Sequence, residues 1–374
     1  MKVIAPGKLM LSGEWSVLEV GVPCIVMAIN QKVGAKGKAA KEIVFSAPDL
    51  GIEKIPAEFD GKKLTWKIPL DEKQTEKLGV AKNAIELTLA YLTAKNPRKK
   101  AKLFEMETFS SDTVAKLPDG KTAKVGFGSS AAVCVAIVGA ILKLNGYKLD
   151  EKTTKNLIFK IACTAHYLAQ GKVGSSFDIA ASTYGGVLVY TRFDPAWLVK
   201  EMTSGKSISE VMDSNWPAFT AEPLTLPQNF ELLTGFVGYS ASTKELIVKI
   251  NEAKEKNRGE YDKIISDIKG VTEKLISAIK TNSESEILSL VKQNRVLLKK
   301  FSDWSNNNLE TKELGVLADT ADKFGAAGKF SGAGGGDCGI AISFNPEISN
   351  KVKGSWKRKG IIPLKVKIDK KGVY

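Results

Sequence analysis

The chain has 374 residues, of which 43% are hydrophobic and 26% are charged, and its formal net charge at pH 7 is +14. This length allows a large buried core and two lobes, and the ordinary share of charged residues excludes wholesale disorder. The longest apolar run, 131–142, is too short to span a bilayer, and the sequence does not begin with a signal-peptide pattern. We therefore expect a soluble, cytoplasmic protein without a membrane partner.

In the first half of the chain, short β-branched or aromatic runs alternate with turn signals and predict strands. Apolar residues at helical spacing predict one helix over 82–93 and another over 151–170. Between them, a glycine-rich turn at 126–130 opens an apolar helix over 131–144. A short helix is expected over 177–182, and the expected strands are 3–5, 24–29, 42–46, 63–68, 102–108 and 187–191.

Residues 192–228 contain several Pro and Trp residues, and we expect this segment to be irregular. This pattern predicts an α+β protein of two lobes with a boundary near residue 190, which gives the domains 1–190 and 191–374. In the second lobe, helices are expected over 243–256, 260–280, 284–302 and 309–324, and strands over 232–237, 327–330, 339–344 and 362–367.

The positive charge would suit a nucleic acid, an anionic membrane or an anionic metabolite as the binding partner. Lysines are scattered along the chain without an aromatic-interleaved basic motif, so we expect no nucleic-acid partner. The chain has one histidine and no CxxC pair, which argues against a zinc site. We expect the four cysteines, Cys24, Cys134, Cys163 and Cys338, to serve as small hydrophobic residues.

Two of four notable segments combine residue types that suit phosphate binding. APGKLMLSGE at 5–14 places Lys8 in apolar surroundings, although a surface lysine in a turn is the alternative. KVGFGSSAA at 124–132 sets two glycines and two serines before an apolar helix. Glycines let the backbone approach a ligand, and a helix N-terminus offers free N–H groups and a partial positive charge. The spacing is that of neither a Walker P-loop nor a Rossmann fingerprint, so a simple helix-capping turn is the alternative.

The other two segments contain an isolated acid and a glycine run. Asp178 is a single acid among small and apolar residues at 165–186, where a carboxylate costs desolvation energy unless it has a partner. A nearby lysine would keep it ionised, and a helix N-cap is the alternative. KFSGAGGGDCGI at 329–340 has five glycines between two expected strands. Such a backbone can wrap a ligand, and a flexible surface loop is the alternative.

In their order and approximate spacing, Pro-Gly-Lys, Gly-x-Gly-Ser-Ser-Ala and Gly-Ala-Gly-Gly-Gly-Asp resemble the motifs of the GHMP kinases from residue 3 to about 345. The resemblance implies a two-lobed α+β fold, with a first lobe like domain 2 of ribosomal protein S5 and a ferredoxin-like second lobe. It also implies ATP and Mg²⁺ as cofactors, and a small-molecule acceptor bound by a monomer or homodimer.

Within this family, AHxxAQGKVGSSFDIAA at 165–181 and YSASTKEL at 239–246 resemble segments of phosphomevalonate kinases. Mevalonate kinases usually carry a glutamate upstream of the aspartate, whereas this chain has no acid between Glu151 and Asp178. The resemblance therefore implies ATP-dependent phosphorylation of 5-phosphomevalonate to 5-diphosphomevalonate in the mevalonate pathway of isoprenoid biosynthesis. Gln170 is the nearest polar replacement for the missing glutamate, which binds Mg²⁺ in several relatives.

The resemblance also implies roles for individual residues. Lys8 and Asp178 would be catalytic and would pair with each other, with Asp178 mainly orienting Lys8 and the acceptor. A strong base is less necessary here than for an alcohol, because the attacking phosphate is already largely ionised near neutral pH. Ser130 would bind Mg²⁺, and His166 is expected to be structural. ATP would contact Gly126, Phe127, Gly128, Ser129, Ser130 and Ala131, with Asn83 and Ser110 near adenine. The acceptor would contact Glu14, Lys172, Ser175, Ser176, Ser242, Thr243, Lys244, Gly334, Gly335 and Gly336.

Three alternatives remain at this point: mevalonate kinase, diphosphomevalonate decarboxylase, and a non-catalytic relative that acts as a sensor. A sensor would be expected to lose Lys8, Asp178 or the glycine-rich turn, and none of them is lost. All of these expectations require the turn at 126–131, the Lys8 amine and the Asp178 carboxylate to meet in one cleft.

Overall fold

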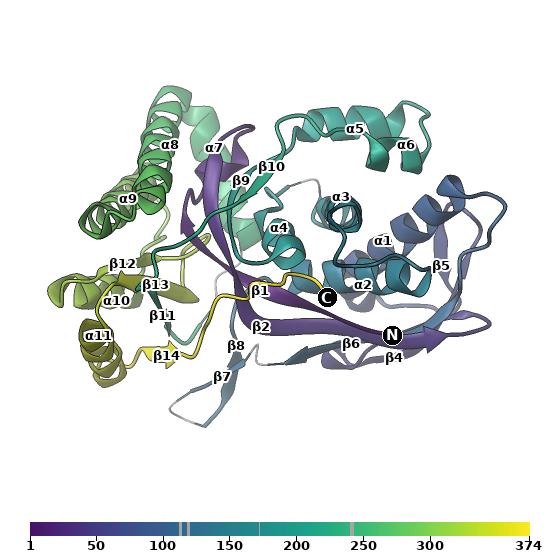
Figure 1. Ribbon diagram of the computed structural model, residues 1–374, viewed down its shortest axis with the longest axis horizontal. Coiled ribbons are helices and arrows are strands. Elements are labelled where there is room, and N and C mark those ends of the chain that lie inside the picture. The colour runs from purple at the N-terminus through teal and green to yellow at the C-terminus, as the bar shows by residue number, and fades with distance from the viewer. Residues whose placement is uncertain (112–113, 118–119, 172, 240–242) are drawn as a thin grey trace.

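The computed structural model describes residues 1–374 except 112–113, 118–119, 172 and 240–242. Its larger sheet has eight strands in the order β10-β9-β2-β6-β3-β4-β5, with β1 paired to β2 (Figure 1). The strands are β1 (Lys2–Ser12), β2 (Pro23–Ala39), β3 (Ile43–Ala47), β4 (Ile52–Phe59), β5 (Leu64–Trp66), β6 (Phe104–Ser111), β9 (Val187–Thr191) and β10 (Thr220–Pro223).

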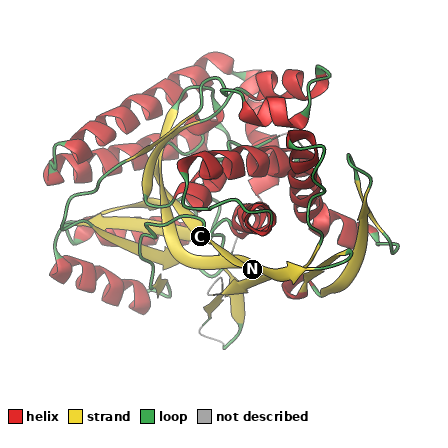
Figure 2. Ribbon diagram, turned by 45° about the vertical axis from the view of Figure 1, so that its right-hand side comes forward, coloured by secondary structure: helices red, strands yellow, loops and turns green. Residues whose placement is uncertain are grey.

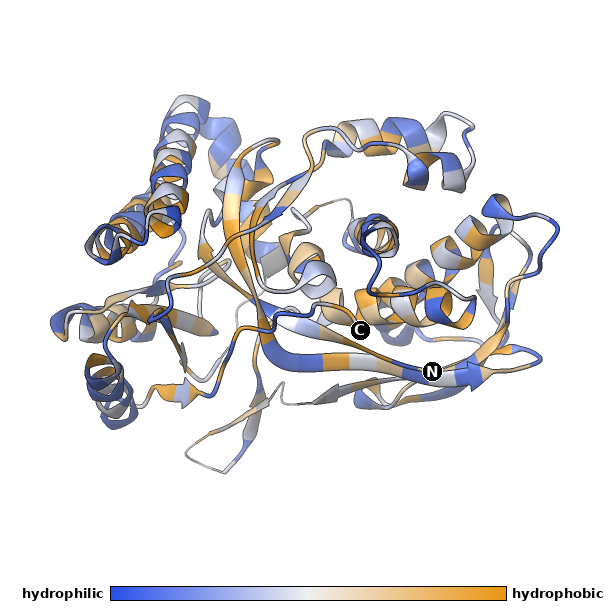
Figure 3. Cartoon of the chain, viewed as in Figure 1, coloured by the Kyte–Doolittle hydropathy of each residue, from blue (hydrophilic) through white to orange (hydrophobic). Residues whose placement is uncertain are grey.

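Four helices gather on one face of this sheet (Figures 1 and 2). They are α1 (Glu72–Lys95), α2 (Ser129–Leu144), α3 (Lys152–Ala169) and α4 (Phe177–Tyr184). α2 is apolar along most of its length, so it occupies the centre of the layer, whereas the largely hydrophilic α11 (Pro346–Arg358) lies at the surface (Figure 3). This burial anchors α2 in the first lobe, whereas its first residues, Ser129 and Ser130, are half-buried and exposed, respectively.

The second lobe contains a four-stranded antiparallel sheet in the order β12-β13-β11-β14. Its strands are β11 (Glu231–Phe236), β12 (Ala327–Phe330), β13 (Cys338–Ser343) and β14 (Ile362–Leu364). The helices are α7 (Thr243–Lys256), α8 (Arg258–Lys280), α9 (Glu284–Trp304), α10 (Lys312–Lys323) and α11. The strand order and the helices that follow β11 and β13 match the ferredoxin-like motif. The predicted α+β class is therefore confirmed.

The two lobes share a hydrophobic core around β1. Successive side chains of a strand point to opposite faces, so Met10 enters the core beneath the first-lobe helices while Leu9 and Leu11 face the other way. There they pack in one cluster with second-lobe residues such as Phe236 and Ile340. The C-terminal tail also returns to the first lobe, where Tyr374 N–H donates to the carbonyl of Ile4 at 3.1 Å. Both sets of contacts join the second half of the chain to β1.

The expectation that 192–228 is irregular is wrong, because this segment contains α5 (Pro195–Thr203), α6 (Ile208–Asp213) and β10. Asp194 caps α5 by accepting hydrogen bonds from Ala196 N–H and Trp197 N–H, and Ser207 forms a capping box with Glu210. Both signals are visible in the sequence. β10 pairs with β9 and extends the first-lobe sheet beyond the predicted boundary at residue 190, which stays a prediction.

Three further elements were missed: α11, β4 and the hairpin of β7 (Val114–Lys116) and β8 (Thr122–Lys124). All four cysteines are buried, as expected for small hydrophobic residues, and burial raises the pKa of each thiol. Across the described residues, none of the helices has the length and apolar character that crossing a membrane requires.

Candidate active site

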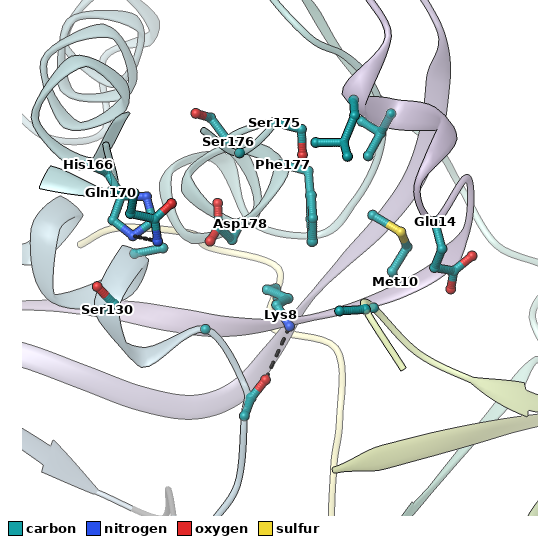
Figure 4. Close-up of a pocket in the computed structure, with 18 of the residues that line it drawn as sticks. Lys8, Met10, Glu14, Ser130, His166, Gln170, Ser175, Ser176, Phe177 and Asp178 are labelled. Atoms are coloured by element: carbon teal, nitrogen blue, oxygen red, sulfur yellow. Dashed lines mark hydrogen bonds between the residues drawn. The ribbon is translucent and has the colours of Figure 1, made fainter. Parts of the chain in front are cut away.

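A cleft of about 360 Å³ lies where β1, the turn before α2, the end of α3, the start of α4 and the loop after β12 meet (Figure 4). Its walls include Lys8, the turn residues Gly126 and Gly128, and Asp178. The structure thus brings together the three groups that the sequence analysis required to converge. The remaining lining residues are Met10, Glu14, Trp15, Val17, Leu18, Ser129, Ser130, Ala131, His166, Gln170, Gly174, Ser175, Ser176, Phe177, Ile247, Gly332, Ala333 and Asp337.

The N-terminus of α2 opens into this cleft. Gly128 is its N-cap, with a φ of 77°, and no side chain caps the helix within the described part of the chain. The first N–H groups of a helix have no intrahelical partner and carry a partial positive charge. Ser129, Ser130 and Ala131, which provide these groups, all line the cleft. This end of α2 therefore offers a site for a phosphate.

A second helix, α4, also begins at the cleft. Its N-cap is Ser176, which has a φ of 61°, a strained value for a residue other than glycine. Asp178 lies in the first turn and is not the N-cap, and its Oδ1 accepts a hydrogen bond from Ile179 N–H at 2.9 Å. Two helix N-termini without side-chain caps thus face one cavity, an arrangement that favours a ligand with more than one anionic group.

Lys8 supplies the positive charge of the cleft but does not pair with Asp178 as predicted. Its Nζ donates to the carbonyl of Gly126 at 3.1 Å, and no ion pair joins Lys8 and Asp178 among the described residues. Gly128 lies between them: a Cβ on it would be 3.1 Å from Lys8 Cγ and 3.7 Å from Asp178 Cβ. In Figure 4 the Asp178 carboxylate is turned toward the side of Ser130 and Gln170.

The glycine-rich loop lines the cleft, but not through the predicted residues Gly334, Gly335 and Gly336. A Cβ on Gly334 would lie 2.6 Å from the Leu309 carbonyl oxygen, and one on Gly336 would lie 2.8 Å from the Tyr239 ring. These glycines, together with Gly335, whose N–H donates to Leu309 at 2.7 Å, pack against the second lobe. Gly332, Ala333 and Asp337 line the cleft in their place.

Glu14, a predicted acceptor contact, is fully buried in an ion pair with the equally buried Lys329. Lys329 Nζ also donates to the carbonyl of Phe330 at 2.8 Å. Burial raises the pKa of Glu14 and lowers the pKa of Lys329, and the attraction between the two partly offsets both shifts. The pair joins the end of β1 to β12 across the lobes, so its first role is structural.

A second cavity of about 430 Å³ shares Ser129 and Ser130 with the cleft, so both cavities border the start of α2. The predicted Ser110 lines it, and its hydroxyl donates to Asp49 at 2.6 Å. Asn83 lines neither cavity, because its amide donates to the carbonyl of Ala165 at 3.3 Å and ties α1 to α3.

The other predicted residues divide into four groups. Ser175 and Ser176 line the cleft, whereas the Phe127 side chain is buried in the core between the lobes and only its backbone belongs to the turn. Lys172 and Ser242 lie outside the described residues. Thr243 and Lys244 begin α7, and their predicted contacts stay predictions.

Two lining residues, Trp15 and Asp337, were not among the predicted site residues, and a third, His166, was expected to be structural. His166 is buried at the cleft, as expected for a structural residue, and its Nε2 lies 3.2 Å from Gln170 Nε2. The apolar wall around Trp15 had no sequence signal. Asp337 had one, because it is an acid directly after the glycine run.

Two family models match the chain: the GHMP kinases N-terminal domain over residues 87–186 and the GHMP kinases C-terminal domain over 275–362. Together they span half of the chain, including the turn before α2, Asp178 and the glycine-rich loop. The chain belongs to the GHMP kinase family. The kinases of this family are phosphotransferases, and ATP binding is typical of the family, which agrees with a cleft built around two helix N-termini.

Relatives of this GHMP kinase act in the mevalonate pathway. A phosphomevalonate kinase of Streptomyces sp. (strain CL190) is 28% identical over 372 residues, covering 96% of this chain and 95% of the relative. A mevalonate kinase of Thermococcus sibiricus is 27% identical, covering 100% and 98%. The structure of Streptococcus pneumoniae phosphomevalonate kinase in complex with phosphomevalonate and AMPPNP superposes with a TM-score of 0.80 at 23% identity, covering 98% and 99%.

Replacing Gly128 with alanine is expected to weaken ADP binding by about tenfold, because the new Cβ meets Lys8 and displaces the turn. The matched control is Gly146→Ala, since Gly146 has a φ of 97° and no atom within 4 Å of its Cβ position. Both variants should lose about 1–2 kcal/mol of stability from backbone strain. Calorimetric titration with ADP should separate them, and equal affinities would contradict this role of Gly128.

Proposed function

We propose that this kinase transfers the γ-phosphoryl group of ATP to 5-phosphomevalonate. The observation that carries the proposal is the meeting of two uncapped helix N-termini, those of α2 and α4, with Lys8 in one cleft. A phosphorylated acceptor and ATP together bring two polyanions to the reaction, and each would have a helix N-terminus to neutralise it. The sequence motifs and the Streptomyces relative support the same acceptor.

In this proposal the ATP phosphates lie at the start of α2, and the base and ribose extend past Ser129 and Ser130 into the second cavity. The acceptor phosphate lies at the start of α4, beside Asp178. Lys8 Nζ, held by the Gly126 carbonyl, neutralises negative charge on the group in transfer. Because a phosphate oxygen is largely ionised near neutral pH, Asp178 is not required as a strong base and orients the acceptor.

Mg²⁺ is part of this proposal and would neutralise charge on the phosphates. Protein kinases and related enzymes hold it by one or two side chains together with phosphates and water. Within the described residues, no cluster of three or more His, Cys, Asp or Glu residues can hold a metal. The Ser130 hydroxyl and the Asp178 carboxylate line the cleft and are oxygen ligands of the kind that Mg²⁺ prefers, so these residues fit such an ion.

The proposal is tested by incubating the enzyme with ATP, Mg²⁺ and either 5-phosphomevalonate, mevalonate or diphosphomevalonate. ADP release is measured in each case, and CO₂ release is measured with diphosphomevalonate. We expect kcat/KM for 5-phosphomevalonate to exceed that for mevalonate by at least about 100-fold, since a site built for a charged group rejects an acceptor without it. Mevalonate phosphorylation is the second candidate, supported by the Thermococcus relative. A preference for mevalonate, or release of CO₂ from diphosphomevalonate, would overturn the proposal.

A further inference from the structure

Asp337, at the end of the glycine-rich loop, reaches across the lobes to the turn before α2. Its Oδ1 accepts a hydrogen bond from Gly126 N–H at 2.8 Å. A Cβ on Gly126 would overlap the other carboxylate oxygen, Oδ2, so the Asp337 carboxylate is packed directly against this glycine. The contact joins residues 211 positions apart in the sequence.

The backbone of Asp337 is held in an unfavourable conformation. Its φ is 66°, in the left-handed region that residues other than glycine seldom adopt. Its N–H donates to the carbonyl of Tyr239 at 2.6 Å, and its carbonyl accepts from Val237 N–H at 3.0 Å. The next residue, Cys338, begins β13, so the carboxylate is aimed at Gly126 from a rigid sheet. Strain that the surroundings maintain in this way is typical of functional sites.

The peptide groups of Gly126 form hydrogen bonds with one anionic and one cationic side chain. Its N–H donates to Asp337, and its carbonyl accepts from Lys8 Nζ. The following N–H, that of Phe127, donates to the carbonyl of Val125 at 2.9 Å. The first two N–H groups of the predicted phosphate turn are therefore used within the protein, and the groups that remain for a phosphate are those at the start of α2. Their direction depends on how the turn is held.

We propose that Asp337 is a positioning residue that fixes the Gly126–Gly128 turn through its hydrogen bond to Gly126. By holding the turn, it aims the N–H groups at the start of α2 toward the nucleotide phosphates. Asp337 itself does not contact the nucleotide. The proposal rests on the binding of nucleotide phosphates at α2, and it is independent of which acceptor the enzyme uses. Its test therefore uses nucleotide affinity without any acceptor.

The experiment compares ADP affinity, measured by calorimetric titration, for the wild type, Asp337→Gly and Asp337→Asn. Glycine removes the acceptor and accepts the positive φ, whereas asparagine keeps an oxygen acceptor and also tolerates this φ. We expect Asp337→Gly to raise the Kd for ADP by about tenfold, and Asp337→Asn to stay within about threefold of the wild type. Asn306→Gly, at another residue with positive φ (49°), controls for added backbone flexibility and should leave the Kd unchanged.

Gly126→Ala provides a second route if Asp337→Gly does not fold. Its Cβ would push the Asp337 carboxylate away, so it should reproduce the tenfold loss. An Asp337→Gly variant that binds ADP as tightly as the wild type, or more tightly, would overturn the proposal. An equal loss in Asp337→Asn and Asp337→Gly would also overturn it, because the charge rather than the hydrogen bond to the turn would then matter.

Discussion

Lys8→Met is expected to lower kcat by about 10²–10³-fold, the usual loss when one preorganised electrostatic donor is removed from a transition state. Lys8 is the one lysine or arginine among the described residues that line the cleft, so no other such side chain there replaces its charge. Its ammonium is held at 3.1 Å by the Gly126 carbonyl and lies 5.8 Å from the centre of the Phe177 ring. Steady-state ADP release with 5-phosphomevalonate measures the effect.

Lys36→Met is the matched control for this prediction. Lys36 lies on β2, the strand next to β1, and its exposed side chain pairs with Glu107 at the surface. Exposed pairs contribute little, so kcat should stay within about twofold of the wild type. A Lys8→Met enzyme that retains more than a tenth of the wild-type kcat would contradict the assigned role of Lys8.

Lys329→Met is expected to lower the free energy of unfolding by about 3–5 kcal/mol, because it leaves the Glu14 carboxylate buried without its partner. Both side chains of this pair are fully buried, so water cannot replace the missing ammonium. Glu14→Gln should also be destabilising, since it leaves the Lys329 ammonium without a countercharge. Urea unfolding of each variant, monitored by circular dichroism, measures the loss of free energy of unfolding.

The double variant Glu14→Gln/Lys329→Met supplies the decisive comparison. The double variant removes the unpaired buried charge but leaves a buried amide at position 14, so it should recover part of the stability lost in Lys329→Met. Losses that simply add would show that each side chain contributes through its own packing, and the pair would then not act as a unit.

Much of the backbone followed from local sequence. The apolar run after Gly128 has the composition of a buried helix, and α2 begins at Ser129, where the glycine-rich turn ends. The hydrophobic spacing over 151–170 likewise predicts α3 closely. Two local signals pointed to helices that we did not predict. The Asp194 and Ser207 caps mark α5 and α6 in a segment that we expected to be irregular.

The sequence alone determined the local elements, because a glycine turn, an apolar helix and an isolated acid are local patterns with local physical consequences, and the order of its motifs indicated the family. Only the tertiary structure decided which groups the charged side chains contact. Lys8 bonds to the Gly126 carbonyl and not to Asp178, Glu14 is taken up by Lys329, and Asp337 reaches Gly126. These contacts join residues more than a hundred positions apart, and the packing of two lobes around β1, which no local pattern encodes, sets their geometry.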